Sequence, residues 1–151
     1  MGIFLYHFHG LGRFDFSMLN PDDLDELQEL AAAQGLEILP TVYLEREALP
    51  QFIAVVEAYG RARREGRLSN IAGFAVEGPL LGPQGGIPRT SRWFPTGSEW
   101  RALARLGRHG LRYVVMAPDA MELGDEIEHG FTFSDLLLEF YGQGARVALV
   151  S

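Results

Sequence analysis

The sequence predicts an α/β fold with parallel strands, and more closely a partial (β/α)8 TIM-type barrel with about five strands and four helices. Apolar runs and helical patterns alternate four times along the chain, and a further apolar run follows them. The apolar runs are continuous rather than alternating with polar residues, which is typical of buried parallel strands. No internal linker interrupts the pattern, so residues 1–151 are expected to form one domain.

A complete barrel of this kind needs about 250 residues, so the 151 residues of this chain would supply only part of one. An open, doubly wound sheet is the alternative architecture. Periodicity alone does not separate the two, because both are built from alternating strands and helices.

The first strand and helix are indicated by a short apolar run and a capping pattern. Residues 3–8 are apolar and rich in aromatic side chains, and Gly10 follows them. Asn20 is expected to cap a helix with Pro21 at its first position, because Asn accepts a backbone hydrogen bond there and Pro has no N–H to lose. Leucines recur at helical spacing until Gly35, which ends the helix.

The remaining elements repeat this alternation. Strands are predicted over 36–44, 71–76, 111–117 and 146–150, and helices over 49–64, 98–108 and 133–141. Pro40 is more typical of a strand's end than of its middle. Ser98 is expected to open the third helix, and Gly66 and Gly110 to end the second and third.

Composition excludes several classes of function. The chain has no cysteine, so disulfides, thiolate metal sites and cysteine nucleophiles are excluded. All thirteen basic residues are arginine, which excludes a Schiff-base lysine. The net charge is −7 without a basic stripe, so we expect no nucleic-acid partner. No apolar run is long enough to span a membrane and no signal peptide opens the chain, so we expect a cytoplasmic protein that has no membrane partner.

Two histidines mark the end of the first strand. In a regular strand, residues two apart point to the same face, so the side chains of His7 and His9 are expected side by side just before Gly10. Ligands of α/β folds bind at the carboxyl ends of parallel strands. Two neutral imidazoles at this spacing suit a divalent metal ion such as zinc. The alternative is a pair of surface histidines near a turn.

Other polar residues follow the later strands. Glu77 ends the third apolar run, where a charge is costly unless it is paired or bound to a metal ion. Thr41 and Asp119 lie at or just beyond the ends of the second and fourth predicted strands and are candidates to contact a substrate at the same mouth. For Glu77 the alternative is local capping of backbone amides, and for Asp119 it is a turn after Pro118.

The long loop after the third strand is rich in glycine and carries arginines. Gly86 and Arg89 are candidates for substrate binding, because a guanidinium group over the mouth of a site binds a phosphate or a carboxylate. The alternative is that the loop arginines are solvated surface charges.

Four motifs, in order, resemble the N-acetylglucosamine-6-phosphate deacetylases of the metal-dependent amidohydrolase superfamily. They are the segment His7–Phe16 with its His-x-His-Gly opening, Leu39–Thr41, the Glu-Gly-Pro of Val76–Leu80, and Val115–Asp119. The chain departs from the family pattern at Leu5, where the family usually has Asp, and at Gly86–Pro88, where the family has Gly-Ala-His.

The resemblance implies a metal-dependent hydrolase that deacetylates an N-acetylated, sugar-like substrate in a (β/α)8 barrel. It implies that His7, His9 and Glu77 are metal ligands and that the cofactor is a divalent ion, with zinc the expected metal. No catalytic base can be assigned, because the family's later histidines and its catalytic aspartate have no counterpart in these 151 residues.

An incomplete barrel would leave its first and last strands as open edges. We therefore expect a homo-oligomer, or a second chain that completes the barrel around a small-molecule substrate. The alternative is a catalytically inactive half-barrel that serves as a binding or assembly module. Metal content would distinguish the two, because only a working hydrolase must fill the site.

Overall fold

A computed structural model of the chain describes residues 2–80, 93–117 and 121–149. A five-stranded sheet forms its centre, and every neighbouring pair of strands is parallel. In spatial order the strands are β1 (Ile3–Phe8), β4 (Leu36–Tyr43), β5 (Phe74–Glu77), β6 (Leu111–Met116) and β9 (Arg146–Leu149). Because spatial order equals sequence order, every crossover leads to the next strand in the same direction around the sheet.

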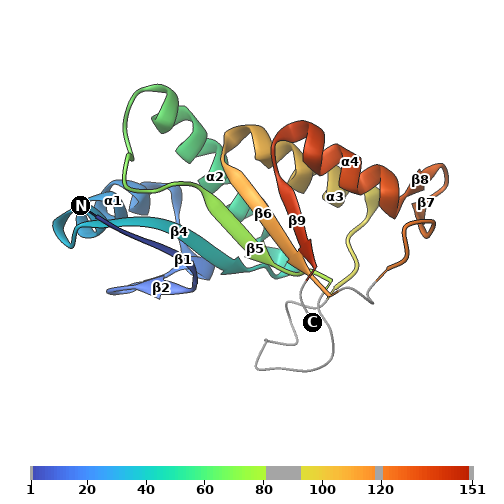
Figure 1. Cartoon of the computed structure of the whole chain (residues 1–151), viewed down its shortest axis with the longest axis horizontal. Coiled ribbons are helices and arrows are strands. Elements are labelled where there is room, and N and C mark those ends of the chain that lie inside the picture. The colour runs from blue at the N-terminus through green and yellow to red at the C-terminus, as the bar shows by residue number, and fades with distance from the viewer. Residues whose placement is uncertain (1, 81–92, 118–120, 150–151) are drawn as a thin grey trace.

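Four α-helices alternate with these strands, as predicted (Figure 1). They are α1 (Leu24–Ala33), α2 (Leu49–Arg64), α3 (Gly97–Arg105) and α4 (Phe133–Gln143). Two small antiparallel hairpins, which the sequence patterns did not predict, are added to this frame. One joins β2 (Gly10–Leu11) to β3 (Phe14–Asp15), and the other joins β7 (Glu126–Glu128) to β8 (Phe131–Thr132).

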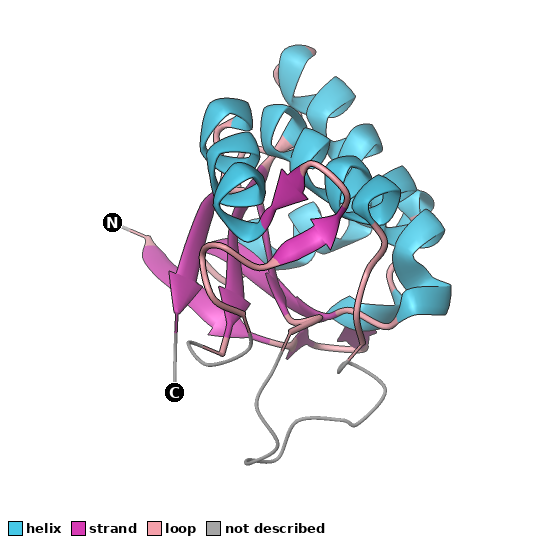
Figure 2. Cartoon of the chain, turned by 90° about the vertical axis from the view of Figure 1, so that its right-hand side faces the viewer, coloured by secondary structure: helices cyan, strands magenta, loops and turns pink. Residues whose placement is uncertain are grey.

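The helices lie on one face of the sheet (Figure 2). Val42, Val76 and Val114 point toward them and belong to the main hydrophobic core. A doubly wound sheet would carry helices on both faces. The one-sided arrangement is that of a barrel wall, with helices outside and the other face turned to the barrel interior. The structure therefore confirms the predicted partial barrel.

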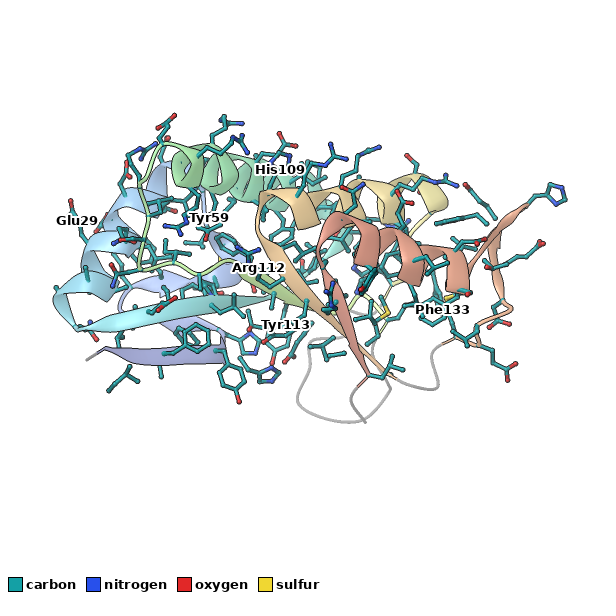
Figure 3. The ribbon with its side chains drawn as sticks, turned by 45° about the horizontal axis from the view of Figure 1, so that its top comes forward. Glu29, Tyr59, His109, Arg112, Tyr113 and Phe133 are labelled. Carbon is teal, nitrogen blue, oxygen red and sulfur yellow. The ribbon has the colours of Figure 1, made fainter. Side chains whose placement is uncertain are left out.

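The core between sheet and helices is large and aromatic. Tyr59 of α2 is buried, and its hydroxyl donates a hydrogen bond to the carbonyl of Ile71 at 2.5 Å. Gly110 has φ of 127°, and a Cβ atom at this position would lie 2.5 Å from the Tyr59 ring. Glycine is therefore required here both by the backbone and by the neighbouring ring. Figure 3 shows Tyr59 and His109 on the helix side of the sheet.

Pro40 lies inside β4 and not at its end, contrary to the sequence-based expectation. Ile38 exchanges hydrogen bonds with Asn70 and Ala72 on the β5 side, and regular pairing with β5 resumes only at Thr41. Backbone groups two residues apart face the same neighbouring strand. The missing N–H of Pro40 therefore falls in this gap, where no ladder hydrogen bond is lost.

The third helix begins at Gly97, one residue before the predicted start, and its N-cap is Thr96 and not Ser98. The Thr96 side chain accepts a hydrogen bond from the Glu99 backbone N–H, and the Glu99 carboxylate accepts one from the Thr96 N–H. This reciprocal pair is a capping box. The helix also ends earlier, at Arg105, and continues as a 3-10 turn over Leu106–His109.

None of the helices in the described ranges is long and apolar enough to cross a membrane.

Candidate functional site

A β-bulge at His7 shapes the carboxyl end of β1. Tyr6 pairs with Leu39 but Phe8 pairs with Pro40, so β1 holds one more residue than β4 at this point. His7 itself has φ of 57°, in the left-handed region that non-glycine residues rarely occupy. Because side chains alternate along a strand, one extra residue reverses the faces beyond it. Phe8 is thereby turned toward the core, where it contacts Phe16 edge-on.

The bulge explains how the two imidazoles reach the open face of the sheet, which is the face without helices. Tyr6 and Leu39 are paired and absent from the helix-side core. In a regular strand, His7 and His9 would then both point toward the helices. The two histidines therefore come together because β1 is bulged at His7, and not because it is a regular strand as predicted.

The strain at His7 can be measured by comparing two substitutions. His7→Val is expected to be less stable than His7→Asn by about 1–2 kcal/mol, because asparagine tolerates the left-handed conformation and a β-branched residue does not. Both variants lose the imidazole, so their difference isolates the backbone term. Urea unfolding of the two metal-free proteins measures it. Equal free energies of unfolding would mean that His7 is not held in this conformation.

Glu77, the last residue of β5, is the point at which the histidines meet. Its side chain is buried, yet His7 Nε2 lies 2.8 Å from Glu77 Oε1 and His9 Nε2 lies 3.8 Å from the same oxygen. His7 is half exposed and His9 is about a third exposed, so the cluster opens to solvent on the histidine side. The structure brings together the three predicted metal ligands at the carboxyl ends of two strands.

The orientation of the His9 ring is fixed by a hydrogen bond on the side away from Glu77. Its Nδ1 lies 2.9 Å from the Thr41 carbonyl oxygen, which can only accept a hydrogen bond, so Nδ1 carries the proton. In the neutral ring, Nε2 then carries the lone pair and faces Glu77. A metal-binding histidine characteristically donates its other ring N–H to a backbone carbonyl or a carboxylate in this way.

Tyrosines that the sequence analysis did not select form the rest of the site. The Tyr43 ring, at the end of β4, stacks on His9 with centroids 3.9 Å apart and planes 11° from parallel. Burial raises the pKa of Tyr43, and the neighbouring Glu77 carboxylate raises it further. Tyr43 lies two residues beyond Thr41 and opposite Glu77 in register, which places the three residues on one face.

Tyr113 of β6 lies on the same face (Figure 3). Burial raises its pKa; the Thr41 side chain lowers it, whereas Glu77 and Tyr6 raise it. The Thr41 side chain is fully buried, and among the described residues no atom lies at hydrogen-bonding distance and angle from its Oγ1. Thr41 is thus adjacent to the site, but contact between its side chain and a substrate stays a prediction.

The donor types suit a divalent metal ion, although the ligand set is not arranged around one. Two imidazoles and a carboxylate are ligands that zinc takes, and His9 presents its lone pair to the cluster. Within the described ranges, however, no group of three or more His, Asp or Glu side chains has the arrangement of a metal site. His7 instead contacts Glu77 directly. The chemistry of the donors therefore fits, and the assignment of the metal stays a prediction.

Three of the predicted substrate-binding residues, Gly86, Arg89 and Asp119, lie outside the described residues.

Comparison with known proteins supports the fold. No family model matches the chain, and no curated protein matches it. Among solved structures, it is similar to an N-acetyl-D-glucosamine-6-phosphate deacetylase from Mycobacterium smegmatis, with a TM-score of 0.66 and 21% sequence identity. The match covers 98% of this chain and 39% of that one, so the chain spans about two-fifths of the length of the protein that it resembles. At this identity the likeness shows a shared fold alone, a partial (β/α)8 barrel.

Proposed function

We propose that this chain is part of a metal-dependent hydrolase of the amidohydrolase superfamily. The observation that carries the proposal is the meeting of His7 and His9 at the buried Glu77 carboxylate. The cluster lies at the carboxyl ends of parallel strands, where barrel enzymes carry their active sites. A fold does not fix a function, so this cluster, and not the barrel alone, supports the proposed hydrolase.

His7, His9 and Glu77 are the residues that would hold the metal ion. When bound, a divalent ion such as zinc polarises a carbonyl oxygen and lowers the pKa of bound water to about 7. The chain's own residues supply orientation: the Thr41 carbonyl fixes the tautomer of His9, and Tyr43 packs against its ring.

The proposed reaction is deacetylation of an N-acetylated, sugar-like substrate. The similar structure supports this choice, because its name describes a deacetylase of an N-acetylated amino sugar phosphate. The departure at Gly86–Pro88 from the family pattern argues that the substrate differs in detail. We therefore propose the class of bond and not a particular sugar.

Metal uptake and acetate release test the proposal together. Purified protein, stripped with a chelator and titrated with zinc, is expected to bind close to one ion per chain, by calorimetry and by plasma mass spectrometry. The loaded protein is then assayed for acetate release from N-acetylated amino sugars, with and without a 6-phosphate. Failure to take up zinc, cobalt or manganese would exclude the proposed mechanism.

A second candidate is a catalytically inactive half-barrel that acts as a binding or assembly module. The close contact between His7 and Glu77 favours it, because this contact satisfies the buried carboxylate without a metal ion. The metal titration separates the two candidates.

We also propose that further strands complete the barrel, from a second copy or from another chain. Large apolar side chains are exposed at both edges of the sheet, namely Ile3, Phe4 and Tyr6 on β1 and Leu149 on β9. Open apolar edges are unfavourable in water and pair readily with other strands.

The expected result is a molar mass above the 16.8 kDa of one chain in size-exclusion chromatography with light scattering. Phe4→Lys is expected to shift the equilibrium toward the monomer, because it places a charge on the β1 edge. A monomer at every concentration tested would contradict self-association, and would leave a different chain as the partner to seek by co-purification.

A further inference from the structure

The packing around His9 assigns a role to a residue outside the ligand set. We infer that Tyr43 is a positioning residue: its ring and the Thr41 carbonyl together hold His9 in one rotamer and one tautomer, with Nε2 directed at Glu77. This inference rests on the proposed metal site and extends it to a residue that touches none of the reacting atoms.

The two restraints on His9 act in different directions. The hydrogen bond from Nδ1 to the Thr41 carbonyl fixes the in-plane position of the ring and its tautomer. It still allows the ring to tilt about that bond. The Tyr43 ring lies almost parallel to His9, at a centroid distance of 3.9 Å, and so blocks tilting on that side. Together the two contacts leave Nε2 with one direction, toward Glu77 Oε1.

His7 provides the contrast within the same site. Its ring is half exposed and meets His9 only edge-on, with centroids 6.1 Å apart. Among the contacts found in the described residues, His7 has no backbone hydrogen bond from its ring and no parallel stacking partner. His9 is therefore the preset ligand and His7 the adaptable one.

Tyr43 is itself held in place by the strand that carries it. It pairs with Glu77 in the β4–β5 register, and its backbone N–H donates to the Ser17 hydroxyl at 3.1 Å. The residue that orients His9 is thus tied to the strand that carries the carboxylate. This arrangement matches the general finding that groups behind metal ligands set ligand geometry, and that their loss costs about 10- to 100-fold in metal affinity.

Side-chain NMR of the metal-free protein tests the inference without relying on metal or on activity. Long-range proton–nitrogen spectra report the tautomer of each histidine. Wild-type His9 is expected as the Nδ1–H tautomer with a single set of signals. Tyr43→Leu, which removes the ring, is expected to give averaged nitrogen shifts, whereas Tyr43→Phe keeps the ring and is expected to match wild type.

Zinc affinity provides the second readout. Tyr43→Leu is expected to bind zinc about 10- to 100-fold more weakly than wild type, and Tyr43→Phe within about threefold. Tyr113→Leu is the matched control: it removes another partly buried tyrosine from the same face and is expected to leave the His9 tautomer unchanged. Should Tyr43→Leu fail to fold, Tyr43→Met replaces it, because methionine keeps most of the volume and cannot stack.

The outcomes are distinguishable. A Tyr43→Leu protein with the wild-type His9 spectrum and wild-type zinc affinity would overturn the inference and leave the metal site standing. A wild-type protein that takes up no zinc would overturn the proposed function, and the NMR comparison would still decide whether Tyr43 orients His9.

Discussion

Glu77→Gln is expected to lower the affinity of the protein for zinc by more than about 100-fold, since loss of a group that only orients a metal ligand already costs about 10- to 100-fold. Glutamine has the shape of glutamate but no negative charge, so it removes the proposed metal ligand and leaves the packing of β5 unchanged. Both His7 and His9 approach this carboxylate. Calorimetric zinc titration of the chelator-stripped protein measures the change.

The same variant separates ligand loss from unfolding. Because His7 is half exposed, loss of its contact with the Glu77 carboxylate costs little, and the free energy of unfolding of the metal-free protein should change by less than about 1 kcal/mol. Glu37→Gln is the matched control, because it removes a carboxylate from an exposed position on the neighbouring strand β4. If Glu77→Gln and Glu37→Gln bound zinc with equal affinity, Glu77 would not be a zinc ligand.

Much of the fold could be predicted because its strands are continuous apolar runs. The bounds of β1 and α2 agree with the sequence patterns to the residue, since a glycine follows two residues after the run of aromatic and aliphatic side chains and two residues after the helical repeat. The short hairpins were missed because each strand in them has only two or three residues. So few residues carry no measurable alternation.

The candidate site was predicted through its residue types and not through its geometry. His7, His9 and Glu77 stand out because histidine and glutamate are unusual at the ends of apolar strands. The bulge that turns His9 to the open face depends on pairing with β4, which no local pattern encodes. Tyr43 was missed because a tyrosine at the end of an apolar run looks like any other strand residue. Its spacing of two from Thr41 was the signal that could have identified it.

The second large effect is expected in the helix layer, where Trp100→Ala should lower the free energy of unfolding by about 3–5 kcal/mol. Trp100 of α3 is 1% exposed, and its ring meets Phe140 of α4 edge-on, with centroids 6.1 Å apart. Removing the indole leaves a cavity between two helices that the sheet holds at fixed positions, so the surroundings relax only in part. Urea unfolding followed by circular dichroism measures the loss.

Phe94→Ala is the control for this substitution, because Phe94 is 74% exposed and its removal should change stability by less than about 0.5 kcal/mol.

The loss of about 4 kcal/mol expected for Trp100→Ala is a large part of the 5–15 kcal/mol that stabilises a typical domain. It should nevertheless leave the zinc affinity of the folded molecules unchanged, since Trp100 packs on the helix face and His9 and Glu77 lie on the other. A Trp100→Ala protein that folds with wild-type stability would show that α3 and α4 do not pack through this pair. One that stays folded but binds zinc weakly would show that the helix layer sets the geometry of the cluster.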